Sequence, residues 1–187
     1  HPANPSNNDA ADFTFSSPDV TSILECKLDG APFAVCISPV HYTGLGDGSH
    51  TFQVRARDAI GNVDETPASF TWTVEMALPT VISVARANAS PTNAAKVSFT
   101  VTFSEAVTGV DKYDFSLVST EAISGAGITS VSGSGATRVI SVNTGTGSGT
   151  LQLDLVDNDS IKDLGKNPLG GPSPVNGNFT TGETYIV

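Results

Sequence analysis

Residues 96–103 read Lys-Val-Ser-Phe-Thr-Val-Thr-Phe. Their apolar side chains recur at every second position, with serine and threonine between them. Successive side chains of a β-strand point to opposite faces, so this alternation predicts a strand with one buried and one exposed face. The residues expected to face inward are Val97, Phe99, Val101 and Phe103.

The same period of two recurs along the chain. In the first 75 residues it marks residues 11–15, 49–58 and 70–74, separated by turn clusters at 17–19, 46–48 and 61–62. In the second half it marks 151–155, and further strands are expected at 80–86, 113–119, 127–131, 138–142 and 177–186. No ten-residue segment shows a helical period. The pattern predicts an all-β protein built from antiparallel β-sandwiches.

The segment 75–79 interrupts the strand pattern and ends in a proline, which cannot continue a central ladder. We therefore predict two tandem domains, at residues 1–77 and 78–187, with the second the larger. A chain of 187 residues is long enough for two small β-sandwiches.

Charge narrows the range of partners. The formal net charge is −10 and the isoelectric point is about 4.4. An acidic surface repels nucleic acid and anionic membranes, and no apolar run reaches the roughly 20 residues of a membrane helix. We expect no nucleic-acid partner and no membrane insertion. The chain begins at His1 rather than Met, which we expect of a processed product or an excised fragment.

The two cysteines, Cys26 and Cys36, are expected to form a disulfide. Residues 24–28 and 33–37 look like the arms of a hairpin with a three-residue loop. In that register Cys26 lies directly opposite Cys36, within disulfide range. A disulfide indicates an oxidising compartment. A metal pair or free thiols are the alternatives, although two cysteines at this spacing lack further metal ligands.

No catalytic constellation stands out, and we predict that the chain is not an enzyme. The three histidines are His1, His41 and His50, and no Gly-x-Ser-x-Gly elbow accompanies them. The glycine-rich residues 145–149 lack the lysine and the helix of a phosphate loop, so we expect a hairpin turn there.

Acidic clusters on expected loops leave calcium open as the one possible cofactor. Carboxylate and amide oxygens are the ligands that calcium prefers, but neither main cluster fits the EF-hand pattern. The alternative is that Asp and Asn cap their own turns, which we favour. The first cluster is Asp58, Asn62 and Asp64, with Glu65; the second is Asp154, Asp157, Asp159 and Asp163, with Asn158; a looser third group is Glu105, Asp111 and Asp114.

Ordered motifs along the chain resemble bacterial Ig-like repeats of very large secreted and surface proteins. The first domain carries Glu-Cys-Lys-Leu-Asp-Gly at 25–30, Tyr-Thr-Gly-Leu at 42–45, Gly-Asn-Val-Asp at 61–64 and Phe-Thr-Trp-Thr-Val at 70–74. The second resembles a different repeat type, with Ser-Glu-Ala-Val-Thr-Gly-Val at 104–110 and Asn-Pro-Leu-Gly-Gly at 167–171.

The resemblance implies two immunoglobulin-like β-sandwiches that serve as spacer, stalk, fibre subunit or adhesive surface outside a bacterial cell. It implies no catalytic site, because such repeats share none. The partners it implies are neighbouring Ig-like domains or further copies of this chain. The alternatives are an adhesin or carbohydrate-binding module, and an accessory domain of a secreted enzyme.

One departure from the resemblance suggests polymerisation. Such repeats open with a short strand before the proline- and asparagine-rich segment seen here at residues 1–8. A first sandwich without that strand would expose an edge that a neighbouring chain could fill, giving head-to-tail assembly. The candidate donor is the C-terminal Thr184, Tyr185, Ile186 and Val187. The alternative, which we favour, is that the chain was cut at an arbitrary place or that the first strand is dispensable.

Overall fold

A computed structural model describes residues 1–120 and 122–187 of the chain. The fold is all-β with antiparallel sheets, consistent with β-sandwich architecture, as the alternation predicts. Contacts divide the chain into two compact units, His1–Ala77 (unit 1) and Leu78–Val187 (unit 2). In the described part of the chain, no helix is long and apolar enough to cross a membrane.

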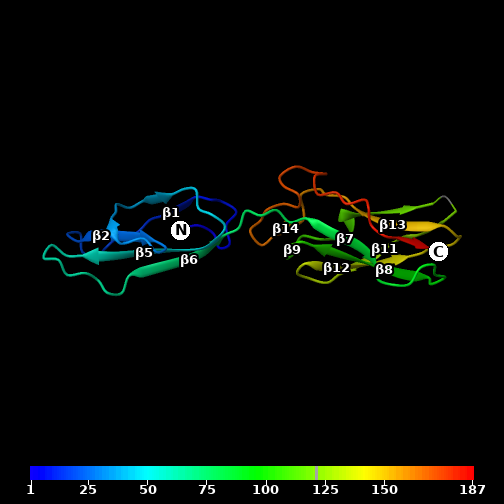
Figure 1. Cartoon of the computed structure of the whole chain (residues 1–187), viewed down its shortest axis with the longest axis horizontal. Coiled ribbons are helices and arrows are strands. Elements are labelled where there is room, and N and C mark those ends of the chain that lie inside the picture. Colours follow the sequence, from blue (N-terminus) through cyan, green and yellow to red (C-terminus); the bar gives the residue numbers. More distant parts are fainter. Residues whose placement is uncertain (121) are drawn as a thin grey trace. The chain divides into compact units, whose positions relative to one another are not determined.

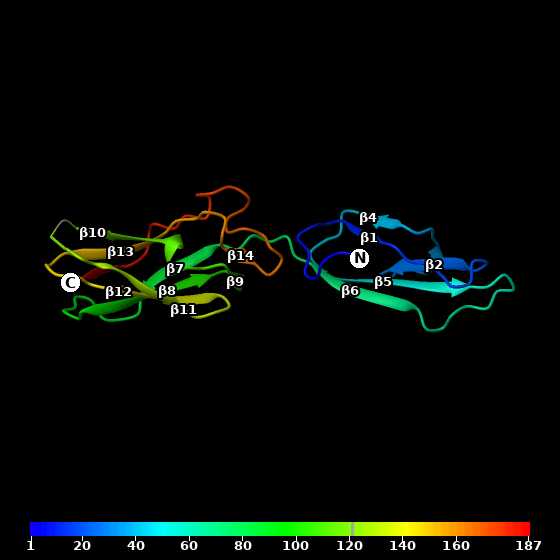
Figure 2. The same cartoon turned by 180° about the vertical axis from the view of Figure 1, so that it is seen from behind.

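Unit 1 is built from six strands in two sheets (Figures 1 and 2). The larger sheet has the order β3-β2-β5-β6, and the smaller one pairs β1 with β4. Strand β6 alternates as predicted for residues 70–74, with Trp72 and Val74 buried, whereas β5 buries only Phe52 of the inward positions predicted at 49–58. The strands are β1 (Ala11–Phe13), β2 (Ile23–Leu28), β3 (Ala34–Val35), β4 (Val40–Tyr42), β5 (Gly48–Arg57) and β6 (Ala68–Val74).

The core of unit 1 is aromatic. Phe13 of β1 stacks on Phe52 of β5, with ring centroids 4.1 Å apart. Trp72 of β6 is fully buried and lies 5.2 Å from Phe13, ring centre to ring centre. Because aromatic rings bury large areas, a few of them supply most of the apolar burial that so small a unit can achieve.

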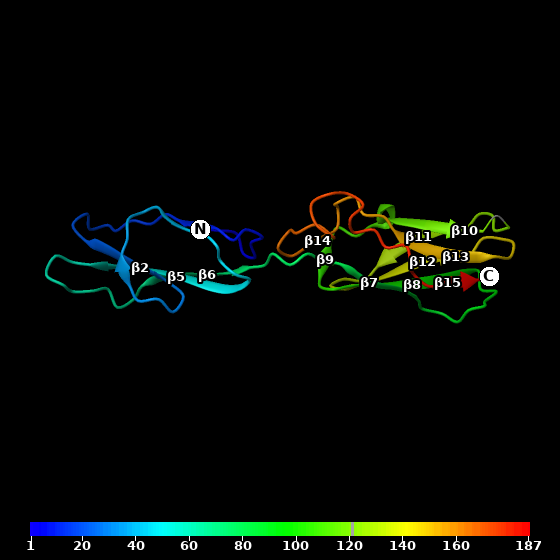
Figure 3. The same ribbon diagram turned by 45° about the horizontal axis from the view of Figure 1, so that its top comes forward.

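In its described residues, 78–120 and 122–187, unit 2 has nine strands in three sheets (Figure 3). The four-stranded sheet has the order β11-β12-β8-β7, the three-stranded sheet β10-β13-β15, and a short sheet pairs β14 with β9. The strands are β7 (Val81–Arg86), β8 (Lys96–Phe103), β9 (Val107–Thr108), β10 (Phe115–Ser119), β11 (Gly127–Ser132), β12 (Thr137–Asn143), β13 (Thr150–Leu155), β14 (Lys162–Asp163) and β15 (Thr184–Ile186).

The core of unit 2 is largely aliphatic. Strand β8 buries every second side chain, which confirms the inward positions predicted for residues 96–103. Strand β13 does the same with Leu151, Leu153 and Leu155, each fully buried. The two strands belong to different sheets and contribute to one apolar cluster, as stacked sheets do.

Two predicted strands of unit 2 are shorter than expected. The strand predicted at residues 113–119 begins only at Phe115, because η1 (Lys112–Asp114), a 3-10 helix capped by Asp111, precedes it. The strand predicted at 177–186 is reduced to Thr184–Ile186, with Phe179 forming a single bridge to Leu155.

Candidate functional site

The predicted disulfide between Cys26 and Cys36 is confirmed, with a Cα–Cα distance of 5.9 Å. It joins β2 to the residue that follows β3, at the border of the larger sheet of unit 1. Cys26 is buried, so the bridge also contributes to the core. A disulfide is typical of an oxidising environment.

The predicted hairpin register is wrong by two residues. Cys26 pairs with Ala34, not with Cys36, and the Cys36 N–H donates to the Leu24 carbonyl instead. The chain turns at Asp29 and Gly30, where the Ala31 N–H donates to the Leu28 carbonyl and Asp29 has a φ of 52°. The turn at Asp29-Gly30 is followed by Pro32, which has no N–H to donate. Residues 31–33 therefore do not pair in the ladder between β2 and β3.

The first predicted calcium cluster forms two local turns. Both Asp58 oxygens accept hydrogen bonds from Asn62, one from its backbone N–H and one from its side-chain amide, each at 2.8 Å. These bonds hold the pKa of Asp58 below its ordinary value. Asp64 accepts from the side chain and backbone of Thr66, which lowers its pKa in the same way. The arrangement is that of aspartates capping their own turns.

Unit 2 repeats the Asp58 turn at Asp163. Here the Asp163 oxygens accept from the backbone N–H and the side-chain amide of Asn167, again at 2.8 Å each. The Asp163 N–H donates to the Asn167 carbonyl at 3.1 Å, as the Asp58 N–H does to Asn62 at 2.9 Å. Whereas Asn62 is exposed, Asp163 and Asn167 are both buried.

The second predicted calcium cluster does not gather into one group. Asp154 accepts from Gln152, while Asp157 accepts from the backbone of Asp159 and Gly177 and so ties two loops together. Among the described residues, no three of the carboxylates of Asp154, Asp157, Asp159 and Asp163 bring their oxygens within 4.8 Å of one another. One Asp159 oxygen is shielded from solvent and has no hydrogen-bond partner in the described part of the chain.

The third acidic group is split between two places. Asp114 is buried; it accepts from Ser160 and from the Asp111 N–H, and so anchors η1. Glu105 lies instead within electrostatic reach of Asp163. Burial, reinforced by the negative charge of Asp163, raises the pKa of Glu105.

Of the three histidines, His50 has the most defined surroundings. Its Nε2 lies 2.8 Å from the Gly46 carbonyl oxygen and its Nδ1 lies 2.9 Å from an Asp29 carboxylate oxygen. Both ring nitrogens therefore face acceptors, which only the protonated ring can satisfy with two N–H donors. The Gly46 carbonyl and the Asp29 carboxylate accordingly raise the pKa of His50. No nucleophile takes part in this contact, which stabilises the turn at Asp29.

The other two histidines have separate surroundings in unit 1. His41 of β4 pairs with Asp12 of β1 at 2.6 Å, and both side chains are largely exposed. The ring of His1 stacks on Phe70 with centroids 4.0 Å apart.

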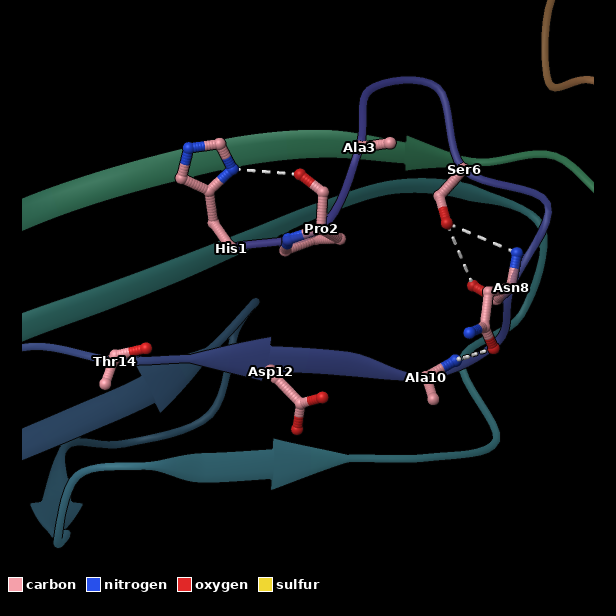
Figure 4. A pocket seen from close by; sticks show the side chains of 8 residues that line it. All are labelled: His1, Pro2, Ala3, Ser6, Asn8, Ala10, Asp12 and Thr14. Atoms are coloured by element: carbon pink, nitrogen blue, oxygen red, sulfur yellow. Dashed lines mark hydrogen bonds between the residues drawn. The ribbon is translucent and has the colours of Figure 1, made fainter.

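A groove of about 300 Å³ runs between residues 1–8 and strand β1 (Figure 4). One wall is formed by Ala10, Asp12 and Thr14, which are alternate residues along β1 and its extension. The other wall includes His1 and Ser6 of the N-terminal segment. None of the residues lining the groove comes from β4, the partner strand of β1.

An apolar pocket of about 190 Å³ opens beside this groove and shares His1 and Thr14 with it. Its floor consists of aromatic core residues, among them Phe15, Phe52 and Phe70. On this side of unit 1, between β1 and β6, the core is therefore accessible from the surface.

The predicted donor strand is already used within its own unit. Thr184–Ile186 forms β15 and pairs with β13, and Tyr185 is fully buried. The Tyr185 hydroxyl donates to the Ser98 carbonyl at 2.7 Å and accepts from the Asn88 N–H at 2.8 Å. Donating this segment to another chain would open the core of unit 2, which argues against the predicted role.

Sequence reasoning missed the groove and the repeated Asp–Asn turn. The turn had a visible signal, because Asp58-Ala-Ile-Gly-Asn62 and Asp163-Leu-Gly-Lys-Asn167 share the aspartate and asparagine four residues apart. The groove had none, since it depends on which edge of β1 the rest of the chain leaves open.

Comparison with known proteins identifies no relative of this chain. No protein-family model, no curated protein and no solved structure matches this chain.

Proposed function

We propose that this chain is a structural repeat of an extracellular bacterial protein, in which two immunoglobulin-like units act as a non-enzymatic spacer. The observation that carries the proposal is the division into two compact units, each with its own apolar cluster, at consecutive residues of one chain. Units of this kind suit a stalk because each folds around its own core and needs no contact with its neighbour.

The strand order of unit 1 supports the immunoglobulin-like assignment. In such sandwiches, strands B and E pair in one sheet, while C, F and G form the other. Here β1 pairs with β4, and β2, β5 and β6 are neighbours in the facing sheet. In chain order, β1, β2, β4, β5 and β6 correspond to strands B, C, E, F and G. The Cys26–Cys36 disulfide supports a location outside the cell.

Stretching single molecules of the full chain tests the spacer proposal. We expect two separate unfolding events, with unit 2 releasing the longer segment, since it has more residues than unit 1. A reducing agent should lengthen only the unit 1 event, because the disulfide removes residues 26–36 from the stretched path. A single event that releases the whole chain would contradict two independent units.

Head-to-tail polymerisation is a separate prediction from the sequence, which the position of β15 within its own unit argues against. It requires Thr184–Val187 to leave β13 and insert into another copy. Electron microscopy of the purified chain would show filaments if this exchange takes place, and single particles at all concentrations if β15 stays in its own unit.

A further inference from the structure

Strand β1 is paired on one side only. The Phe15 N–H donates to the Ser38 side chain, and the Asp9 carbonyl accepts from Leu45, so these residues point their backbone groups toward the β4 side. In an antiparallel pair, the backbone groups of successive residues point alternately to the two sides. Asp12 must then direct both its N–H and its C=O away from β4.

The open side of β1 has no strand partner in residues 1–120 or 122–187. Residues 1–8 do not fill it, because they associate with β6 instead. Ser6 forms a parallel bridge with Val74, and the Asn4 side chain accepts from the Thr73 N–H. An unpaired strand edge is a template for the backbone of another segment.

The surroundings of this edge indicate what kind of segment fits. The edge faces the groove of about 300 Å³, so there is room beside Asp12. Side chains that point inward from an added strand would lie next to Phe13 and the pocket floored by Phe15, Phe52 and Phe70. Inward positions therefore favour apolar residues, while the outward position lies beside Asp12, whose carboxylate contacts His41 of β4 at 2.6 Å and whose side chain is 75% exposed.

We propose that the free edge of β1 binds an extended segment of another polypeptide as an added β-strand. The segment has apolar residues opposite Ala11 and Phe13 and a lysine or arginine opposite Asp12. Backbone hydrogen bonds supply affinity and the alternate side chains supply selectivity. The proposal does not rest on the spacer function.

Charge argues against a second copy as the occupant of this edge. Two β1 strands paired symmetrically through Asp12 would place two carboxylates directly opposite each other, which is destabilising. The whole chain carries a net charge of −10, so a basic segment is the complementary partner.

A synthetic peptide tests the proposal with the full chain. The probe is acetyl-Thr-Thr-Val-Lys-Val-Thr-Thr-amide, titrated to millimolar concentration while backbone amide NMR signals are followed. We expect saturable shifts at Asp12 and Thr14, and slower hydrogen exchange of the Asp12 amide in the complex. N-methylation of the central lysine removes the donor that faces β1 and should weaken binding roughly tenfold. N-methylation of an adjacent valine, whose N–H faces away, is the matched control and should have a smaller effect.

A charge exchange tests the predicted selectivity. The Asp12→Lys variant should prefer the same peptide with glutamate in place of lysine, and the wild-type chain should prefer the lysine peptide. Preserved Trp72 fluorescence would show that the variant is folded.

Three results would overturn the proposal. The first is no saturable shift at residues 10–14 with the lysine peptide. The second is equal weakening by both N-methylated peptides, together with no reversal of preference in Asp12→Lys. The third is concentration-dependent shifts at these residues without peptide, which would identify a second copy as the occupant.

Discussion

The two units reach a stable fold by different means. Unit 1 relies on stacked aromatic rings and a disulfide, and leaves one edge of β1 open. Unit 2 has no cysteine; it buries aliphatic strands from two facing sheets and anchors its last strand through Tyr185. The difference shows that a small sheet pair with an accessible core can be held by a covalent link, whereas a larger one depends on packing.

The same Asp–Asn turn forms in both units. The Asp58–Asn62 turn lies at the surface of unit 1, whereas Asp163 and Asn167, the two ends of the second turn, are buried in unit 2. The bonds of the two turns have matching lengths, so the local geometry does not depend on burial. The two turns differ in how much stability is lost when one hydrogen-bond partner is removed, because an unsatisfied polar group is more destabilising when it is buried.

The largest expected effect comes from Tyr185→Ala in unit 2. Removing a fully buried ring should lower the free energy of unfolding of unit 2 by about 3–5 kcal/mol. Trp72 is the only tryptophan of the chain and lies in unit 1, so its fluorescence isolates unit 1, while circular dichroism reports both units. We expect the unfolding transition to shift when it is followed by circular dichroism and to stay unchanged when it is followed by Trp72 fluorescence. The control is Ile186→Ala, whose side chain is half exposed; an equal loss there would contradict the account.

Replacing both cysteines by alanine should affect unit 1 alone. Removing the Cys26–Cys36 link should lower the free energy of unfolding of unit 1 by about 2–3 kcal/mol, by the loop-entropy argument. Denaturant titration followed by Trp72 fluorescence measures this loss. A shift of the unit 2 transition of similar size would show that the units are not independent.

The repeated turn offers a matched pair of substitutions. Gly61 and Lys166 occupy the same place in the two turns, with φ of 98° and 76°. A side chain in the left-handed region costs about 1–2 kcal/mol, and a Cβ at Gly61 would meet no atom within 4 Å. Gly61→Ala should therefore destabilise unit 1, and Lys166→Gly should stabilise unit 2 by about 1 kcal/mol. Thermal unfolding of the two variants would contradict this if both shifts had the same sign.

The smallest effect is the pH dependence that His50 gives to the stability of unit 1. The pKa of His50 is raised, so its stabilisation is fully present below the ordinary value of 6.5 and is lost as the pH rises through the raised pKa. Burial opposes ionisation of Asp29, but hydrogen bonds from His50 and Thr51 outweigh it and lower the Asp29 pKa. The contact should therefore be lost again in acid. Melting of His50→Gln should show a weaker decline above pH 6.5, while His41→Gln, at an exposed pair, should melt like the wild type.

The sequence predicted what depends on local pattern. Strands with one buried face, such as residues 96–103, are visible because burial imposes a period of two. The disulfide was also predictable, but its register was not, because the turn at Asp29 and Pro32 fixes pairing through backbone conformation. The groove beside β1 depends on contacts between residues far apart, such as Ser6 with Val74, which leave no local pattern.

Hydrogen exchange of the free full chain tests the open edge of β1 most directly. Asp12 and Phe13 are neighbours in one strand, yet only Phe13 should direct its N–H toward β4. We predict that the Phe13 amide is protected, whereas the Asp12 amide exchanges nearly as fast as an unstructured one. Equal protection of the two amides would show that the edge is already covered, and would contradict the account.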